Sequence, residues 1–287
     1  MRYGVTMFVT DVSIDVVELA RETEARGLGS LWLPEHTHIP TSRKTPYPGS
    51  RDGVLPEEYW RALDPLVGLA AAAAATTTLR LGTGILLAAQ RDPIVTAKAV
   101  ATLDHVSGGR AALGVGYGWN EEEMADHGVE YHRRRAVARE HILAMDALWR
   151  EDEASFEGEH VRFGPSWSWP KPAQRDRAGA PHVPVLLGGA AGPKLFAAIA
   201  EHGDGWIPIG GAGMAEALPR LRAAVEEAGR DPGELELIPF WSVPDAGKLD
   251  HYAEIGASEV VFMLPSAGRD RILPLLDRYG ELIAARD

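Results

Sequence analysis

The sequence predicts an α/β fold of the (β/α)8 barrel type, the TIM-barrel architecture, with insertions after the second strand and the fourth helix. Short apolar segments of strand length alternate with longer amphipathic segments along the chain, which is typical of a parallel sheet built from strand–helix units. Eight such units fit into the 287 residues. This number of units in this length favours a closed barrel over the alternative, an open doubly wound sheet.

The predicted strands are apolar nearly throughout, as expected when both faces of a parallel sheet are buried. They are Tyr3–Val9, Ser30–Pro34, Leu79–Leu86, Ala111–Val115, Val183–Leu187, Gly205–Ile209, Leu235–Trp241 and Glu259–Leu264. Glycine follows several predicted helices, and proline opens two of them at Pro93 and Pro193, which are the expected end and start signals. The predicted helices are Ile14–Ala25, Asp64–Ala75, Pro93–Val106, Arg133–Arg150, Pro193–His202, Met214–Ala228, Lys248–Ile255 and Arg269–Ala285.

Two long connections interrupt this alternation. Thr37–Arg61 follows the second predicted strand, and Ser155–His182 follows the fourth predicted helix and contains a predicted hairpin, Phe156–Phe163. Loops of this length in a compact domain usually cover a site or are mobile. The first connection begins at the C-terminal end of a strand, where barrel active sites lie. No linker divides the chain, so we interpret residues 1–287 as a single domain.

Composition excludes several classes of function. The formal net charge is −12, which argues against a nucleic-acid-binding role because phosphate binding needs clustered lysine and arginine. The chain has no cysteine, which excludes disulfides, thiolate metal sites and a cysteine nucleophile. Met1–Val5 has no signal-peptide pattern, and the apolar run Leu66–Ala75 is too short to span a bilayer. The sequence therefore predicts a cytoplasmic protein that binds neither nucleic acid nor membranes.

The C-terminal ends of the predicted strands are rich in glycine. In Gly114–Asn120, three glycines at alternate positions would let a flat or phosphorylated ligand approach the backbone. This run is not the dinucleotide-binding fingerprint, because Trp119 stands where that pattern needs glycine. Gly188–Pro193 is a turn into a helix, and we interpret it either as an anion site or as an ordinary tight turn. Gly84 within a buried strand marks a bulge, a close ligand approach or simple barrel packing.

His36 is the titratable side chain best suited to chemistry, because histidine exchanges protons near neutral pH. The alternative is a histidine that only packs at the rim of the barrel. Glu35 would tune or orient His36, or would simply be solvated. His36 and His38 together resemble a metal motif, but later strand ends offer Gly, Pro and Leu where a metal site needs His or acidic ligands. We therefore predict no metal site.

These motifs converge on one family. The chain resembles the luciferase-like flavin and deazaflavin oxidoreductases, the bacterial luciferase superfamily, over nearly its whole length, and it is most similar to the branch that uses the deazaflavin coenzyme F420. The motifs that carry the resemblance are Gly27-x-x-Ser30-Leu31-Trp32-x-x-Glu35-His36, Leu81-Gly82-Thr83-Gly84-Ile85, Leu103-Asp104-x-x-Ser107-Gly108-Gly109-Arg110, Leu113-Gly114-Val115-Gly116-x-Gly118-Trp119, Val185-Leu186-Leu187-Gly188-Gly189 and Gly203-Asp204-Gly205-Trp206.

The resemblance implies a deazaflavin whose ring lies across the strand ends and whose phosphate meets the turn after the fifth strand. It implies a non-prolyl cis peptide between Gly84 and Ile85, and a proton-transfer role for His36, with Glu35 where some members carry another acid. The implied cofactor-binding residues are Thr83, Gly84, Ile85, Gly116, Gly118, Asn120, Gly188, Gly189, Ala190 and Gly192. The two long connections would shape the substrate pocket, with Trp167, Trp169, Phe240 and Trp241 as candidate walls.

The predicted function is hydride transfer between F420 and a small organic substrate, with His36 supplying or removing the proton. One alternative is an FMN-dependent monooxygenase of the same fold, supplied by a partner flavin reductase, and another is a flavin-binding protein without catalysis. An enzyme that reduces F420 or the flavin is a compatible partner. Barrels of this family are often homodimers, and the resemblance extends that expectation to this chain.

Overall fold

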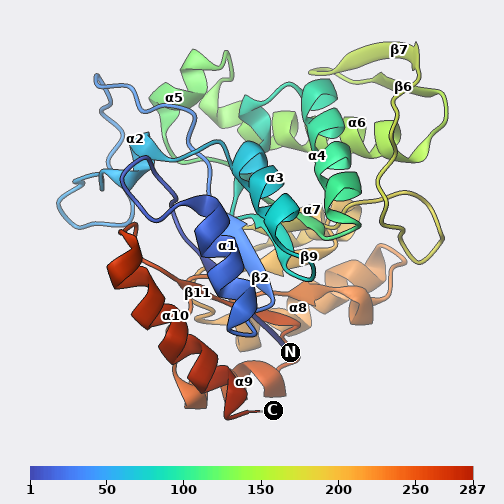
Figure 1. Cartoon of the computed structure of the whole chain (residues 1–287). Coiled ribbons are helices and arrows are strands. Elements are labelled where there is room, and N and C mark those ends of the chain that lie inside the picture. Colours follow the sequence, from blue (N-terminus) through green and yellow to red (C-terminus); the bar gives the residue numbers. More distant parts are fainter. Residues whose placement is uncertain (287) are drawn as a thin grey trace.

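The computed structural model describes residues 1–286 and confirms the barrel. Parallel strands follow one another around the molecule, and helices cover their outer side (Figure 1). The order of the strands is β10-β9-β8-β5-β3-β2-β1-β11, with β4 (Leu86–Leu87) pairing with β5 outside this path. The barrel strands are β1 (Arg2–Thr6), β2 (Ser30–Leu33), β3 (Arg80–Thr83), β5 (Ala111–Gly116), β8 (Val185–Gly188), β9 (Gly205–Ile207), β10 (Glu236–Leu237) and β11 (Glu259–Met263).

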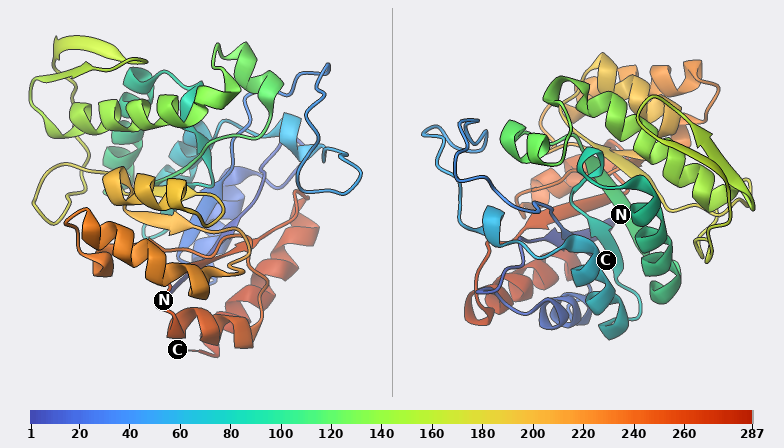
Figure 2. Two further views of the ribbon diagram at one scale, coloured as in Figure 1. Left: turned by 180° about the vertical axis from the view of Figure 1, so that it is seen from behind. Right: turned by 90° about the horizontal axis from the view of Figure 1, so that it is seen from above.

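The helices run back along the outside of the barrel, one after each barrel strand (Figures 1 and 2). They are α1 (Val16–Ala25), α3 (Pro65–Ala75), α4 (Pro93–Ser107), α6 (Arg134–Arg150), α7 (Pro193–His202), α8 (Met214–Glu227), α9 (Ala246–Glu254) and α10 (Arg269–Ala284). Smaller elements lie in the connections: α2 (Glu58–Arg61), α5 (Glu121–Asp126), the hairpin β6 (Ala154–Glu157) and β7 (Arg162–Ser166), and the 3-10 turns η1 (Ala88–Gln90), η2 (Tyr131–Arg133) and η3 (Pro232–Glu234).

Most predicted strands are shorter in the structure, and two of them differ most. The segment Leu79–Leu86 divides into β3 and β4 around a cis peptide bond between Gly84 and Ile85. The segment Leu235–Trp241 contains only β10, and Pro239 within it has no N–H to donate. The barrel still closes beyond β10, because the N–H of Val261 donates to the carbonyl of Pro239 at 3.0 Å and Ser242 pairs with Phe262 in parallel.

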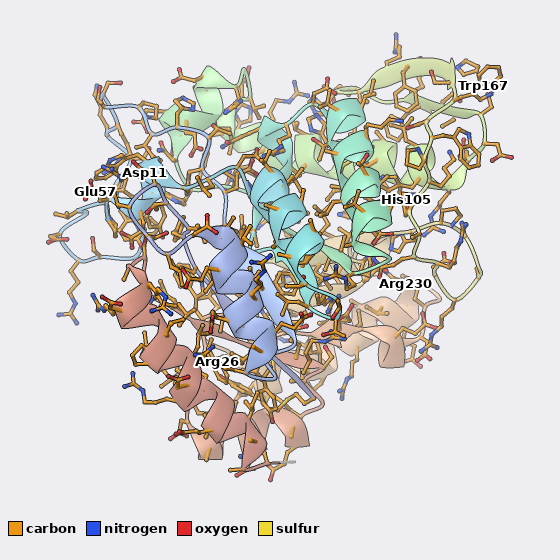
Figure 3. All side chains as sticks on the ribbon, viewed as in Figure 1. Asp11, Arg26, Glu57, His105, Trp167 and Arg230 are labelled. Atoms are coloured by element: carbon orange, nitrogen blue, oxygen red, sulfur yellow. The ribbon has the colours of Figure 1, made fainter. Side chains whose placement is uncertain are left out.

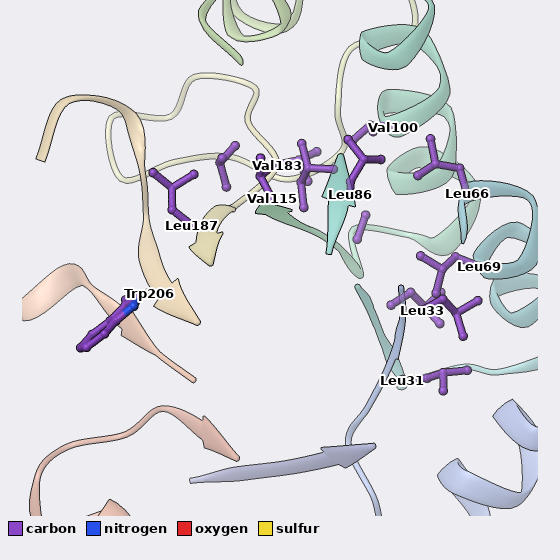
Figure 4. Packing of buried hydrophobic residues seen from close by; sticks show 14 of the residues in the cluster. Leu31, Leu33, Leu66, Leu69, Leu86, Val100, Val115, Val183, Leu187 and Trp206 are labelled. Atoms are coloured by element: carbon purple, nitrogen blue, oxygen red, sulfur yellow. The ribbon is translucent and has the colours of Figure 1, made fainter. Parts of the chain in front are cut away.

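Alternating residues of the strands divide the core into two layers, as the period of two in a β-strand requires. Leu31 and Leu33 of β2 point outward to the helices, where Leu66 and Leu69 of α3 lie (Figure 4). Trp32 between them fills the barrel interior with a smaller cluster that includes Leu186, Ile207, Ile238 and Phe240. A Cβ on Gly82 would lie 2.1 Å from the Trp32 ring, so glycine is needed there.

Several helices begin where a short polar side chain accepts hydrogen bonds from free backbone N–H groups. Asp15, Asp64, Asp92 and Asp245 cap α1, α3, α4 and α9 in this way. The α4 helix ends at Gly108, whose φ of 70° is left-handed and therefore favours glycine. These local signals explain why the helix boundaries could be predicted closely from the sequence.

A buried ion cluster joins the strands at the N-terminal end of the barrel. The carboxylate of Glu259 on β11 is fully buried and accepts from Arg2 at 3.1 Å, Arg80 at 3.0 Å and the Trp32 indole at 2.8 Å. Arg80 also donates to Glu236 at 2.6 and 2.7 Å. The cluster therefore links β1, β2, β3, β10 and β11 through side chains alone.

A second polar cluster connects α6 to the strands β8 and β9. His182 Nε2 lies 2.7 Å from Asp204 Oδ2, and its Nδ1 lies 3.1 Å from Asp146 Oδ1. Burial alone would lower the pKa of His182, but the two carboxylates outweigh it and raise the pKa to about 9. The imidazolium therefore holds the two carboxylates together at neutral pH.

The two long connections lie on opposite sides of the molecule (Figure 2, right). Thr37–Arg61, which contains α2, crosses the C-terminal ends of the first strands. The β6–β7 hairpin packs beside α6 instead, where Glu140 accepts from the backbone N–H groups of His160 and Val161 at 2.6 and 3.1 Å. Within residues 1–286, no helix is both long and apolar enough to cross a membrane.

Replacing Glu259 with alanine should lower the free energy of unfolding by about 3–5 kcal/mol, because it leaves the buried Arg80 guanidinium with only one of its two carboxylates. Chemical denaturation measures this effect. The matched control is Glu254→Ala on exposed α9, which should change stability by no more than about 0.5 kcal/mol. Equal effects of the two substitutions would show that the buried ion pair of Glu259 with Arg80 does not stabilise the barrel.

Replacing His182 with glutamine should destabilise the protein most below about pH 6.5, the ordinary pKa of histidine, because the raised pKa stabilises the folded state while the imidazole is protonated. The difference from the parent protein should shrink as the pH rises through about 9. Urea unfolding at pH 6 and pH 10 tests this expectation. His132→Gln, at an exposed position, is the control, and a pH-independent loss in His182→Gln would refute the interpretation.

Candidate active site at the C-terminal end of the barrel

His36 and Glu35 follow β2 and point in different directions, as successive side chains of an extended backbone do. The His36 ring faces α5, where its Nδ1 lies 2.7 Å from Oε2 of Glu123. Only 6% of the His36 side chain and 1% of the Glu123 side chain are exposed. A carboxylate on Nδ1 fixes the ring and favours the proton on that nitrogen, which leaves Nε2 for a reacting group.

Glu123 is a site residue that the sequence reasoning missed. It lies in the first turn of α5, where Asn120 caps the helix by accepting from the Glu123 N–H at 3.3 Å. The second carboxylate oxygen of Glu123 accepts from the backbone N–H of Thr37 at 3.3 Å. An N-cap residue followed three positions later by glutamate is a known helix-start pattern, which predicts the start of α5 but places the glutamate on the N-cap N–H rather than on His36.

Glu35 is buried and does not contact His36. Its carboxylate accepts from the Leu87 N–H at 2.6 Å and from Arg91 Nε at 2.5 Å. The Arg91 guanidinium also donates to the carboxylate of Asp64, the residue that caps α3, at 2.5 Å. Burial raises the pKa of Glu35, and Arg91 opposes the rise by favouring the carboxylate. The sequence-based option that Glu35 is solvated is therefore wrong, and Glu123 occupies the orienting position next to His36.

The predicted residues of strand 3 meet those of the two following barrel strands. The Thr83 hydroxyl donates to the carbonyl of Gly114 at 2.8 Å, and the peptide bond after Gly84 is cis, as the resemblance implied. The Ile85 side chain lies over two of the predicted glycines, because a Cβ on Gly116 would be 2.3 Å and one on Gly188 would be 3.4 Å from it. We call Ile85 and the three glycines Gly84, Gly116 and Gly188 the floor; a Cβ on Gly84 would lie 2.4 Å from the Phe240 ring.

Gly118 and Asn120 lie at the edge of this floor. Gly118 has a φ of 72°, and a Cβ there would be 2.9 Å from Met124. Asn120 is 1% exposed, and its Nδ2 has no hydrogen-bond partner among residues 1–286. A buried amide N–H₂ without a partner is costly, so this group is suited to donate to a bound molecule.

The turn Gly188–Gly192 opens onto solvent at the N-terminus of α7. Gly192 is the N-cap residue, and within the described chain no side chain caps this helix. Ala190 and Lys194 are exposed, and the Gly189 carbonyl accepts from the Trp206 indole at 3.0 Å. A helix start with free N–H groups and a nearby lysine is suited to bind a phosphate.

Aromatic rings pack against His36. We call Phe8, Tyr47, Tyr59 and Trp119 the aromatic wall. The Tyr59 and Trp119 rings lie 5.2 and 5.9 Å from the His36 ring, and Phe8 packs on Tyr59 at 4.5 Å. Burial and a 2.8 Å hydrogen bond to the Tyr47 hydroxyl raise the pKa of Tyr59, which keeps the phenol neutral. The sequence reasoning gave Tyr47 and Tyr59 no role, since tyrosines in an irregular insertion carry no periodic signal.

Two of the four candidate pocket walls were wrong. Trp167 and Trp169 are 80% and 59% exposed. Trp167 lies far from Glu57 of the insertion (Figure 3). The reason is that α6 runs against the strands, so the connection after it starts at the N-terminal end of the barrel. Phe240 is buried in the barrel interior against Gly84, and Trp241 packs against both that interior cluster and the aromatic wall.

His38 lies outside this cluster, on the surface, where its Nε2 is 3.1 Å from Asp126 Oδ2. Residues 1–286 contain no group of three or more His, Asp or Glu side chains placed to hold a metal ion. His36 contacts Glu123 whereas His38 contacts Asp126, so the two histidines point to different partners.

Glu122 of α5 attaches the insertion to the barrel. Its carboxylate accepts from the Lys44 N–H at 2.7 Å, the Thr45 N–H at 3.2 Å and the Thr45 hydroxyl at 2.6 Å. The hydrogen bond from the Thr45 side chain is the main reason that the pKa of Glu122 falls to about 2. The loop that carries Tyr47 and Tyr59 is thus fixed by the same short helix that orients His36.

Comparison with known proteins agrees with this architecture. The family model described as luciferase-like monooxygenase matches residues 10–243, and the chain belongs to that family. An uncharacterised protein of Mycobacterium tuberculosis is 42% identical over 286 residues, which are 99% of each chain. The F420-dependent glucose-6-phosphate dehydrogenase of Kineococcus radiotolerans is 30% identical over 233 residues, 77% of this chain and 61% of that protein.

Among solved structures, an F420-dependent secondary alcohol dehydrogenase in complex with an F420-acetone adduct superimposes with a TM-score of 0.76 and 18% identity. The match covers 100% of both chains. At this identity the likeness concerns the fold. Proteins described as F420-dependent are thus among those to which this chain is similar.

Replacing Glu122 with alanine should release the insertion, because three hydrogen bonds to residues 44 and 45 are lost. Limited trypsin digestion should then cut faster at Arg43 and Lys44. The control is Glu121→Ala, since Glu121 is the exposed neighbour in the same helix. Identical digestion of the two variants would show that Glu122 does not hold this loop.

Proposed function

We propose that this protein is an F420-dependent oxidoreductase that transfers a hydride to or from a small organic substrate. One observation carries the proposal: the His36–Glu123 pair stands at the same end of the barrel as the glycine-lined floor under Ile85. Relatives that use F420 support the choice of cofactor. A proton-transferring His36–Glu123 pair beside a cofactor surface supports a reaction in which a proton moves together with a hydride.

The residues present fit a deazaflavin. Gly84, Ile85, Gly116 and Gly188 would offer an apolar surface that suits an aromatic ring system, because the aliphatic Ile85 side chain lies over Gly116 and Gly188. Asn120 supplies a buried, unpartnered N–H₂ group for a polar atom of the cofactor. The turn formed by Gly188, Gly189, Ala190 and Gly192 would hold its phosphate at the start of α7. Thr83 and Gly118 would support this surface from below and from its edge.

When bound, the deazaflavin supplies a carbon centre that donates or accepts a hydride. His36 gives a proton to the substrate oxygen, or takes one from it, through Nε2. Glu123 holds Nδ1 and stabilises the imidazolium that forms during oxidation. The aromatic wall excludes water from the reacting atoms, which strengthens the interaction between His36 and the substrate.

Glu35 has a positioning role in this proposal. Its carboxylate accepts hydrogen bonds from the Leu87 N–H and from Arg91. These bonds hold the end of β2 against β4 and thereby fix the backbone of His36. A direct catalytic role for Glu35 would require these contacts to break. We therefore assign the role of orienting His36 to the Glu123 carboxylate.

Titration of the purified protein with F420 and with FMN, side by side, tests the choice of cofactor. Tighter binding of F420 is expected, and exclusive binding of FMN would instead favour an oxygen-activating monooxygenase. The variant His36→Ala should bind F420 with nearly unchanged affinity, because His36 does not belong to the floor. Its turnover should fall by ~10²-fold or more, as for the loss of a general acid or base. Unchanged turnover would remove His36 from the mechanism.

A further inference from the structure

A cavity of about 410 Å³ lies between the short helix α5 and the long helix α6. We call it the α5–α6 cavity. Its walls come from η1, the start of α4, the segment after α5, α6 itself and the turn of the β6–β7 hairpin. None of these residues belongs to the floor or to the aromatic wall, and the volume is that of a small-molecule site. Its polar side chains include Gln90, Arg91, His127, Arg133, His141 and His160.

Two side chains of this cavity have buried polar atoms without a hydrogen-bond partner. Within residues 1–286, eight buried side-chain nitrogen and oxygen atoms lack a partner, and three of them belong to Gln90 and His160. Gln90 is 7% exposed, and neither its Oε1 nor its Nε2 is bonded. Burying such groups is costly, and a molecule bound in the cavity would satisfy them.

The polar groups of the cavity both donate and accept hydrogen bonds. The amide of Gln90 offers an N–H₂ donor and a carbonyl acceptor. His141 Nδ1 lies 2.8 Å from the carbonyl oxygen of Ala88, so Nδ1 carries the proton and Nε2 of the neutral ring is an acceptor. Burial lowers the pKa of His141, which keeps the ring neutral at neutral pH. Hydroxyl groups match this set, because each hydroxyl also donates and accepts.

The charges of the cavity disfavour an anion. Its two guanidinium groups, those of Arg91 and Arg133, already donate to carboxylates. Two acidic side chains, Asp92 and Glu130, also line the cavity. An anion would therefore lose water without gaining a free cation, whereas an uncharged molecule avoids that cost.

We propose that the α5–α6 cavity binds a small uncharged polyhydroxylated compound, of the size of a monosaccharide or a cyclitol, through Gln90, His141 and His160. Hydroxyls donate to Gln90 Oε1 and His141 Nε2 and accept from Gln90 Nε2. The compound is a bound ligand and not the reactant, so the inference does not depend on the choice of cofactor. Gln90 stands between the cavity and the edge of the floor, because a Cβ on Gly118 would lie 3.6 Å from Gln90 Nε2.

Isothermal titration calorimetry of the purified protein compares two polyols with two matched probes. The polyols are myo-inositol and D-glucose. Cyclohexanol has the ring size of myo-inositol and a single hydroxyl, and inorganic phosphate is the anion. We expect saturable binding of at least one polyol in the millimolar range or tighter, and binding of cyclohexanol and phosphate that is weaker by about tenfold or more. Binding of neither polyol overturns the inference, and so does equal or tighter binding of cyclohexanol or phosphate.

Gln90→Leu tests whether this amide serves the ligand or the fold. The other glutamine of the chain, Gln174, donates to Asp104 at 2.6 Å and to the Ala111 carbonyl at 2.8 Å. Gln90→Leu should weaken polyol binding by about tenfold or more and keep or raise Tm, because it removes an unpartnered amide. Gln174→Leu, the matched control, should lower Tm and keep polyol binding. Parent-like polyol binding in Gln90→Leu overturns the inference, and so does an equal loss of Tm in both variants.

His160→Leu is a second variant in a different element, the hairpin turn, and should also weaken polyol binding by about tenfold or more. Its control is His132→Leu, at an exposed position outside the cavity. Equal polyol binding in these two variants would show that the ligand lies elsewhere. Titration with F420 separates the cavity from the floor. If Gln90→Leu loses F420 affinity and keeps polyol binding, Gln90 serves the floor and the inference is wrong, whereas a parent protein that does not bind F420 contradicts only the proposed function.

Discussion

The buried carboxylate of Glu259 is the constraint on which the barrel depends. It gathers Arg2, Arg80 and the Trp32 indole at the N-terminal end of the barrel, and Arg80 extends the cluster to Glu236. A buried charge is stable only when its partners stay in place, so the strands that carry them must keep their register. Trp32 adds bulk above this cluster and fills the interior, which leaves little freedom for the strands to shift.

A fixed lower end allows the upper end to be irregular. There the backbone carries a cis bond at Gly84-Ile85, glycine in place of side chains, and a long insertion after β2. The short helix α5 holds two parts of this end in place, because Glu123 orients His36 and Glu122 binds the insertion. Proton chemistry and substrate enclosure are thus coupled through adjacent residues of one helix.

Much of the fold could be predicted because its signals are local. Asp-Pro starts, glycine ends and apolar strands mark the elements, and the structure confirms the predicted order. The floor glycines could also be found, since glycine at a strand end is visible in the sequence. The partner of His36 could not, because Glu123 is distant in the chain and its role depends on where α5 lies. Trp167 and Trp169 were misassigned because the direction of α6 decides which end of the barrel their loop serves.

The sequence by itself determined the repeating strand–helix pattern, the family to which the chain belongs, and the positions of the glycines at the strand ends. Those properties follow from residue type and from spacing along the chain. Only the tertiary structure decided that Glu35 is held by Arg91, that Glu123 faces His36, and that rings from separate loops enclose the reacting position. The physical reason is that such contacts depend on the relative placement of segments, which barrel closure sets and no local pattern records.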